Sequence, residues 1–552
     1  MSAAGRETSA AASNAGSTAG STAGPTAGPT AGSTAGAASR GLTSAAMAAA
    51  LVPFAYLVHR FDFVCDDAFI TFRYSRNLSE GLGLVYNPPA LEAPVEGYSE
   101  FLWAWLMSLG ISVGAAPEVL SRLLSVAAGV LLVTCLVRHL ARRLGDAPAS
   151  LVASGLLLGT APPLAVWSTG GMATMPTALL AVVLFLLAVG ERPTGWRGRG
   201  TRMALVAGGL VLMRADAALL VALVLAPVIL VGLRRREPDR WRPAVMGAGG
   251  SFAVFFAHMT WRNATYGDWI PNTARVKLGF TGPALERGLD YVVSAWLSMP
   301  GLGLMTVGAL AGAWLGRGRF GPAASAGLAS VVVGGTAYAI SSGGDFMCFA
   351  RFLVPVIPFT VLGSAGALAW VERRSRGAAG ALGLGAAALS VLAAFDLHVV
   401  PESIRRAFHF RHNQTLMGVA LSTSEVEQWR NMSGRAAYWG EVGRALARHA
   451  PPGSSLVYGA VGAIGYHSGL FIHDRNGLVT REVAMRPPHS QLRSPGHDKV
   501  VPAEFFLRYE PSYLDAGLCA AAAFPPPAKA GARVEVLGPG ERPGTVLWVQ
   551  RP

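Results

Sequence analysis

The sequence is short of charged residues and of cysteine. Only 14% of its 552 residues are charged and 52% are hydrophobic, whereas a soluble protein of this size carries roughly a quarter charged residues. The four cysteines, Cys65, Cys135, Cys348 and Cys519, follow no zinc or thioredoxin spacing. Long apolar runs, separated by short arginine-rich runs, instead predict many transmembrane helices.

The positive net charge does not indicate a nucleic-acid partner. The chain carries +14 at neutral pH, but its basic residues gather on no single domain. They lie in short clusters between apolar runs, which is the pattern that sets membrane topology. We therefore expect a lipid bilayer, and no nucleic acid, among the partners.

Three regions differ in composition. Residues 1–41 are of low complexity, with a repeated STAG/PTAG tetrapeptide over 17–36, and a segment with so little to bury is predicted to be disordered. Residues 42–398 contain the apolar runs, and we interpret 60–118 as the first outer loop, with juxtamembrane helices. Residues 399–552 are polar with short alternating runs, such as "SSLVYGAVGAIGYHSGL" and "RVEVLGPG", which predict a soluble α/β domain.

The apolar runs predict about eleven membrane spans. The first run has no cleavage site of its own, so we interpret it as a retained span. The run 203–233 is too long for one helix, and we expect it to turn at Arg214 and Asp216 as a hairpin of two spans. The predicted runs are 42–59, 119–139, 148–167, 172–190, 203–233, 244–261, 294–315, 322–341, 351–370 and 377–398.

Arginine clusters set the predicted orientation. The positive-inside rule places all five clusters in the cytoplasm if the N-terminus is cytoplasmic and the C-terminal domain is extracytoplasmic. This holds only if the apolar stretch 101–114 does not cross the bilayer. We expect that stretch to lie on the outer interface as a helix, with Trp103 and Trp105 at headgroup level.

Ionisable residues at a membrane edge are costly, and here they gather in the predicted outer loops. Asp66 and Asp67 follow the first span, and a partly shielded carboxylate can act as a general base. Guanidinium and ammonium groups suit a phosphate, and the candidates are Arg73, Arg76, Lys277 and Arg351. Together they suit sugar transfer from a lipid-linked phosphate donor to a hydroxyl acceptor.

Each feature also has a purely structural interpretation. The adjacent acids could be a solvated pair, the arginines exposed loop charges, and Asp268 the cap of a proline turn. For Arg214 and Asp216 we favour a structural ion pair. The histidines of the C-terminal region, His467, His473 and His489, are more typical of surface or fold positions than of metal ligands.

Seven stretches in this order resemble a known family. They are "DDAFITFRYSRNLSEGLGLVYNP", "PVEGYSEFLW", "VWSTGGMAT", "YGDWIPNTARVK", "GGDFMCFARFLVPVIP", "GAIGYHSGL" and "SPGHDKV". They are similar to GT-C class polytopic glycosyltransferases, and within that class to the terminal arabinofuranosyltransferase-like group of mycobacteria and its bacterial relatives. The resemblance implies a GT-C fold and inverting transfer from a polyprenyl-phosphate sugar, arabinofuranose among the candidates. The implied acceptor is an envelope glycan or glycoconjugate on the outer side of the bacterial inner membrane.

The resemblance also implies roles for residues. Asp66 would be the base, and Asp67 would orient the acceptor or a metal. No cofactor is certain, and these two acids are the candidate ligands for Mg²⁺ or Ca²⁺. Residues expected to line the cavity, contact the acceptor or place the outer domain over it are Tyr74, Asp268, Asn272, Asp345, His497 and Asp498. One departure is Ala173, which stands where the group carries an acid, so the sugar could differ.

Two rival functions remain. A non-enzymatic envelope or flagellar-motility factor that keeps the fold would tolerate loss of Asp66 and Asp67. A transporter of lipid-linked sugars predicts internal repeats and charges at the bilayer midplane. No internal repeat is visible, and the polar residues gather at the outer edge, so we rank the transporter last.

Overall fold

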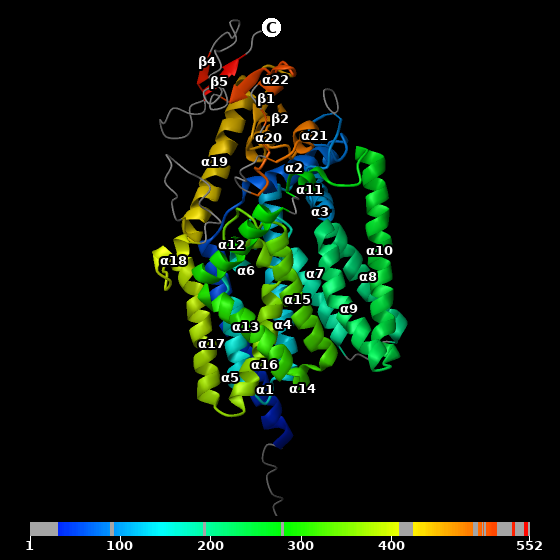
Figure 1. The fold of residues 1–552 in the computed structure, drawn as a ribbon, viewed down its shortest axis with the longest axis vertical. Helices are drawn as coiled ribbons and strands as arrows, with labels where there is room; N and C mark the ends of the chain where they lie inside the picture. Colours follow the sequence, from blue (N-terminus) through cyan, green and yellow to red (C-terminus); the bar gives the residue numbers. More distant parts are fainter. Residues whose placement is uncertain are drawn as a thin grey trace, which may run out of the picture. The chain divides into compact units, whose positions relative to one another are not determined.

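The computed structural model describes residues 31–88, 93–190, 195–277, 281–407, 423–488, 495–499, 501, 504–515, 533–535 and 546–549. Residues 42–552 form one compact unit, in which long helices carry a small sheet and short helices at one end (Figure 1). Of residues 1–41 the structure describes only 31–41, which are helical. The predicted disorder of the remainder of the tail lies outside the described residues.

Every predicted span falls on helical structure. The long helices of the body are α1 (Ala31–Arg60), α4 (Pro117–Arg143), α5 (Pro148–Gly159), α7 (Thr174–Val189), α8 (Trp196–Met213), α9 (Ala218–Arg234), α10 (Pro238–Tyr266), α13 (Pro300–Leu315), α15 (Pro322–Ser341), α16 (Ile357–Glu372) and α17 (Arg376–Val391). By length and apolar character, five of the described helices can each cross a bilayer alone, or six if a bent pair counts as one span. Others, such as α5 and α7, are apolar but shorter than a full crossing.

Prolines and charges break several predicted runs. The run 203–233 stops at Met213, passes through η1 (Ala215–Ala217) and resumes as α9, so it turns at Arg214 as expected. The run 294–315 is not one straight span. The helices α12 (Gly282–Ser298) and α13 meet at Pro300 with a bend of 106°, because proline lacks the amide that would continue the helix and instead favours a first turn.

Prolines also divide two further predicted runs. The run 148–167 becomes α5 and the short α6 (Pro162–Val166), which starts on two prolines. The run 351–370 becomes η2 (Arg351–Leu353) followed by α16, which carries Pro358 in its first turn. The remaining short helices of the body are α14 (Arg317–Phe320), η3 (Leu392–Phe395) and α18 (Glu402–Arg406).

The first loop forms two helices, α2 (Asp66–Ser79) and α3 (Phe101–Ser112), which pack against each other. The expectation that Trp103 lies at headgroup level is wrong. Its side chain is buried, and its Nε1 donates to the Gly171 carbonyl at 3.0 Å, because α3 packs its apolar face on the helical body. Trp105 on the other face is 43% exposed.

The C-terminal region is a small α/β domain. Its sheet has the order β2-β1-β3-β5-β4, with β1 parallel to β2 and β3, and β5 antiparallel to β3 and β4. The strands are β1 (Ser455–Tyr458), β2 (Phe471–Asp474), β3 (Tyr513–Asp515), β4 (Arg533–Glu535) and β5 (Val546–Val549). The helices are α19 (Glu425–His449), α20 (Ala463–Ser468), α21 (Arg481–Ala484) and α22 (Glu504–Leu507).

The first loop is built into the core of this domain. One hydrophobic cluster combines Tyr74, Tyr86 and Tyr98 of the loop with apolar residues of α19, β1 and β2. Burying several aromatic rings together contributes a large share of the apolar area that stabilises such a small domain. The loop and the C-terminal domain therefore form one structural unit beside the helical body.

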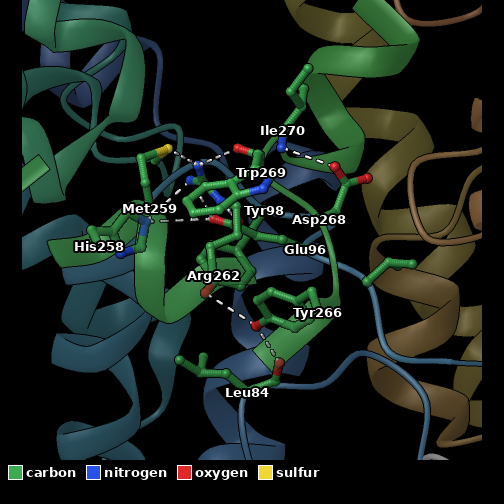
Figure 2. Close-up of polar contacts among 12 residues, drawn as sticks. Leu84, Glu96, Tyr98, His258, Met259, Arg262, Tyr266, Asp268, Trp269 and Ile270 are labelled. Atoms are coloured by element: carbon green, nitrogen blue, oxygen red, sulfur yellow. Dashed lines mark hydrogen bonds and ion pairs between the residues drawn. The ribbon is translucent and has the colours of Figure 1, made fainter. Parts of the chain in front are cut away.

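A buried ion pair fastens the end of α10 to the same loop. Figure 2 shows Arg262 directed toward Glu96, whose Oε1 it contacts at 3.1 Å through Nη2. Both side chains are almost fully buried. Tyr266, one helical turn further on, donates to the Leu84 carbonyl at 2.7 Å (Figure 2). These contacts join α10 to a loop that is far away in the sequence. They hold the end of α10, after which the short α11 (Asn272–Lys277) follows.

We predict that Arg262→Met destabilises the protein by about 3–5 kcal/mol, because it leaves Glu96 buried without a partner. The double variant with Glu96→Gln should recover part of this loss. Tryptophan-fluorescence unfolding of the detergent-solubilised protein would measure both. Arg275→Met is the control, since its pair with Asp268 is partly exposed and should be worth about 1 kcal/mol or less. Equal losses in the two single variants would contradict the prediction.

Candidate active site

A cavity of about 400 Å³ lies between the start of α2 and the C-terminal domain. Asp66 and Asp67 of the first loop line it. The opposite wall comes from α19, through Gln428, Asn431 and Arg435, and from the loop that carries His497. The walls combine carboxylates, amides, a guanidinium group and the ring of Trp439, which is the mixture expected for a pocket that binds a polar ligand.

Asp66 is held by the C-terminal domain. The amides of Ala463 and Gly462, at the start of α20, donate to its two carboxylate oxygens at 2.7 and 3.1 Å. Burial outweighs these hydrogen bonds, and with the nearby charge of Asp67 it raises the pKa of Asp66 to about 7. Asp66 thus joins α2 to α20 and titrates near neutral pH.

Asp67 differs from Asp66 in its hydrogen bonds. The side chains of both acids are half-buried on the cavity wall. Within the part of the chain that the structure describes, the carboxylate of Asp67 makes no hydrogen bond or ion pair. Of the two acids, Asp67 is therefore the one whose oxygens are free to meet a ligand.

Arg351 lies below the acids at the edge of the helical body. Its Nε donates to Asp345 at 2.6 Å, and both side chains are buried. The carboxylates of Asp345 and Asp67 stabilise the positive charge of Arg351. The guanidinium also lies over the Trp167 ring at 5.5 Å, so Arg351 is a fixed cation next to Asp67.

A second cavity, of about 50 Å³, is lined by Arg351 and by residues of α7, α9 and α15. Leu219, Leu220, Leu223, Pro355 and Val356 form its apolar part, and Arg214 and Asp216 lie with Arg351 at its polar part. An apolar groove that ends at cations suits a lipid carrying a phosphate.

Arg214 and Asp216 form the ion pair that we favoured. Two hydrogen bonds of 3.0 and 2.8 Å join them, and Tyr338 donates to Asp216 at 2.7 Å. Arg214 also lies 3.6 Å from the buried carboxylate of Glu100. Burial raises the pKa of Glu100, while Arg214 and the Ala173 amide oppose that shift. The carboxylate of Glu100, directly before α3, thus lies beside Ala173, the position at which the resemblance implies an acid.

The structure places two predicted phosphate ligands away from both cavities. Arg73 is buried and donates to the carbonyls of Tyr86, Gly465 and Leu470 at 2.6–2.9 Å. Arg76 donates to the Tyr466 carbonyl at 2.7 Å. Both side chains tie α2 to the segment that contains α20. The Lys277 side chain lies outside the described residues.

Three predicted cavity residues take part in joining segments. The Tyr74 hydroxyl donates to Val95 and accepts from the Gly97 amide. Asp268 pairs with Arg275 and accepts from the Ile270 amide at 3.1 Å, as the turn interpretation requires (Figure 2). Asn272 donates to the carbonyls of Gly477 and Leu478 of the C-terminal domain. The structure does not bring these three to the cavity wall.

The segment that contains His497 and Asp498 covers the cavity from the C-terminal domain. Asp498 is buried and forms two hydrogen bonds of 3.0 Å with Arg287 of α12. His497 lines the cavity, with its ring 5.2 Å from that of Phe346. The salt bridge holds this segment against the helical body.

Sequence reasoning missed the wall formed by α19. Gln428, Asn431 and Arg435 lie in an ordinary mixed polar helix, which gave no motif. Glu96 and Glu100 stand in the quoted stretch "PVEGYSEFLW", and their position four residues apart in the first loop was a usable signal.

The described residues contain no group of three metal-ligating side chains placed to hold an ion. Asp66 accepts two amides, so only Asp67 of the proposed pair has a free carboxylate. The residues present therefore do not form a protein-only site for Mg²⁺ or Ca²⁺, which need six or more oxygen ligands.

Comparisons with known proteins match parts of the sequence and the fold. A family model described as "Domain of unknown function (DUF8728)" matches residues 425–536, from α19 onward. The chain is 28% identical over 241 residues to the terminal β-(1→2)-arabinofuranosyltransferase of Mycobacterium tuberculosis. That match covers 42% of this chain and 37% of the relative's length.

The fold matches solved structures over nearly the whole chain. ArnT from Cupriavidus metallidurans bound to undecaprenyl phosphate aligns with a TM-score of 0.58 at 17% identity, covering 92% of this chain and 97% of ArnT. Its apo state aligns equally well, covering 93% and 98%. The predicted GT-C fold is thus confirmed, and with its apolar helices the chain is a multi-pass membrane protein.

The environment of Asp66 predicts a pH dependence of stability. Its pKa of about 7 in the folded protein exceeds the ordinary value of about 3.9. The folded state therefore binds more protons than the unfolded chain between these values, and stability falls as pH rises through that window. The pKa of Asp474, raised to about 6 by burial, adds a change of the same sign.

We expect the unfolding midpoint of the detergent-solubilised protein to fall between pH 5 and pH 8, over the upper part of that window. In Asp66→Asn this fall should be smaller, because the variant cannot titrate at that position. Asp62→Asn, at an exposed acid near the start of the same loop, should keep the full fall. If Asp66→Asn and wild type show the same slope, the buried environment described for Asp66 is incorrect.

Proposed function

We propose that the chain is an inverting glycosyltransferase that takes a sugar from a polyprenyl-phosphate donor. The observation that carries the proposal is the electrostatic interaction between Asp67, whose carboxylate makes no hydrogen bond within the described residues and lines the polar cavity, and Arg351, a fixed cation that lines the second cavity. Such a transfer needs a base for the acceptor and a cation for the phosphate, one facing water and the other facing lipid.

The donor binds from the helical body. Its prenyl chain lies against the apolar walls of α9 and α15, and its phosphate meets Arg351. Arg351 donates through Nε to Asp345, which leaves a terminal nitrogen for a phosphate oxygen. ArnT, which shares the fold, has been solved with undecaprenyl phosphate, and this supports a lipid-phosphate donor here.

The acceptor enters under the C-terminal domain. Gln428, Asn431 and Arg435 provide amide and guanidinium groups on the wall opposite the acids, and such groups suit the hydroxyls of a glycan. We thus assign to the domain of unknown function the role of completing the acceptor side of the cavity.

The reaction follows from these positions. Asp67 accepts the proton of an acceptor hydroxyl while the hydroxyl oxygen attacks the anomeric carbon of the donor. The bond from that carbon to the phosphate oxygen breaks, and the lipid phosphate leaves with the electron pair beside Arg351. Attack from the side opposite the leaving group inverts the anomeric centre. No step needs a metal ion.

This assignment exchanges the roles first expected for the two acids. Asp66 is engaged by the amides of α20, so we propose it as a positioning residue that holds the C-terminal domain over the cavity. The acceptor is proposed to be an envelope glycan on the extracytoplasmic side of the inner membrane, as the arginine clusters predict. The arabinofuranosyltransferase relative makes arabinofuranose the first sugar to test.

The rival functions make different predictions. A non-enzymatic envelope or motility factor would need no free acid beside a fixed cation. A transporter of lipid-linked sugars would need a path through the helical body. The polar cavity instead lies against the C-terminal domain, and the second cavity, lined by α7, α9 and α15, holds only about 50 Å³.

The acids can be separated by transfer of labelled sugar from a panel of polyprenyl-phosphate donors. Asp67→Asn should lower the rate by about 10²–10⁴, as loss of a general base does. Asp66→Asn should lower it less. Asp62→Asn serves as the matched acid outside the cavity. Loss in Asp66→Asn alone would return the role of base to Asp66, and full activity in both variants would mean that neither acid is the base. No transfer by the wild type from any donor of the panel would favour the non-enzymatic rival.

The phosphate assignment has its own test. Arg351→Lys keeps the charge beside Asp345 but loses the planar guanidinium group, so we expect kcat/KM for the lipid donor to fall about 10- to 100-fold. Arg76→Lys is the control, since Arg76 lines neither cavity. If Arg76→Lys causes the greater loss, the donor phosphate binds at α2 and not at Arg351.

A further inference from the structure

A third cavity, of about 500 Å³, lies at the end of the helical body away from the sheet. The last turns of α4 and the first turns of α8 flank it, and α7, which packs against both helices, forms its floor. Five arginines line it, namely Arg138, Arg142, Arg143, Arg199 and Arg202. No aspartate or glutamate of the described chain is among its lining residues.

Most of these charges are uncompensated. Among the residues that the structure describes, Arg138, Arg142, Arg143 and Arg202 make no ion pair. Some arginines of the other clusters are paired, as Arg319 is with Asp146 and Arg240 with Glu237. The positive-inside rule explains why arginines gather at this end, but not why four of them that make no ion pair within the described residues line one cavity. Like charges held this close repel each other, and a bound anion would remove that cost.

The cavity also has an ordered cation and an apolar side. Arg199 donates to the carbonyls of Leu187 and Ala188 at 2.8 and 2.7 Å, which fixes its guanidinium group at the end of α7. Further along the same faces, toward the middle of the helices, Leu131 on α4 and Leu205 on α8 are 54% and 71% exposed. A ligand that fits both parts has an anionic head and apolar chains.

We propose that this cavity binds the phosphate headgroup of an anionic phospholipid from the adjacent leaflet, which the arginine clusters predict to be the cytoplasmic one. The acyl chains lie along α4 and α8 over Leu131 and Leu205. Basic pockets between transmembrane helices favour headgroups with two phosphates, and several guanidinium groups can share such a headgroup through paired hydrogen bonds. This site is separate from the proposed transfer site and does not depend on it.

The test is native mass spectrometry of the full-length purified protein titrated with cardiolipin or with phosphatidylethanolamine. The triple variant Arg138→Gln, Arg142→Gln, Arg202→Gln should bind cardiolipin about a hundredfold more weakly. The matched control is Arg234→Gln, Arg235→Gln, Arg236→Gln, which removes three exposed arginines at the end of α9 and should bind as wild type does. Replacing the first three by lysine keeps the charge that membrane insertion needs, and should weaken binding less than glutamine does.

Three results would overturn the proposal. Equal weakening in the control triple would mean that overall charge, and not this cavity, attracts the lipid. Equal binding of phosphatidylethanolamine would remove the need for an anion. Displacement of cardiolipin by an equal concentration of inorganic pyrophosphate would identify a site for a free phosphate. If the glutamine triple does not fold, the lysine triple carries the comparison, and unchanged binding in it would count against the site.

Discussion

The arrangement of the candidate site depends on one buried guanidinium group. Within the described residues Arg73 has no carboxylate partner. It donates to backbone carbonyls of its own loop and of the C-terminal domain, and its cation lies 4.2 Å from the centre of the Tyr86 ring. A buried charge is tolerated only when its donors are satisfied. The folded chain therefore holds these carbonyls against Arg73. The same contacts place α20 so that the amides at its start reach Asp66.

Several independent contacts act in the same direction. Asn272 holds the loop after β2, Asp498 holds the segment with His497, and Glu96 holds the end of α10. Each is a polar side chain that joins parts of the chain far apart in sequence. Together they give the cavity rigid walls, which is what positions an acceptor hydroxyl against a base. Much of the unusual polarity of the loops thus serves to build the site, and only a few side chains remain to bind a substrate.

The sequence was sufficient for the architecture because membrane spans and their arginine flanks are local signals. The run 322–341 coincides with α15, and the charges at Arg214 and Asp216 mark the turn between α8 and α9. Helix breaks at Pro162 and Pro300 were equally local but were missed, because hydropathy alone does not register a proline. Arg73 shows why the site could not be predicted fully. The sequence shows a cation near two acids, but only the fold shows that carbonyls almost 400 residues away already accept its hydrogen bonds.

The interlock between the first loop and the C-terminal domain has a consequence for how the protein is made. Arg73 and Gly465 are separated by 392 positions, which at about 5–20 residues per second is roughly 20–80 s of synthesis. Throughout that time the first loop, with Tyr74, Tyr86 and Tyr98, exists without the strands that later cover its rings. The nascent chain therefore exposes an aggregation-prone aromatic surface at the membrane edge. Its biogenesis requires that this surface be protected until the last fifth of the chain is synthesised.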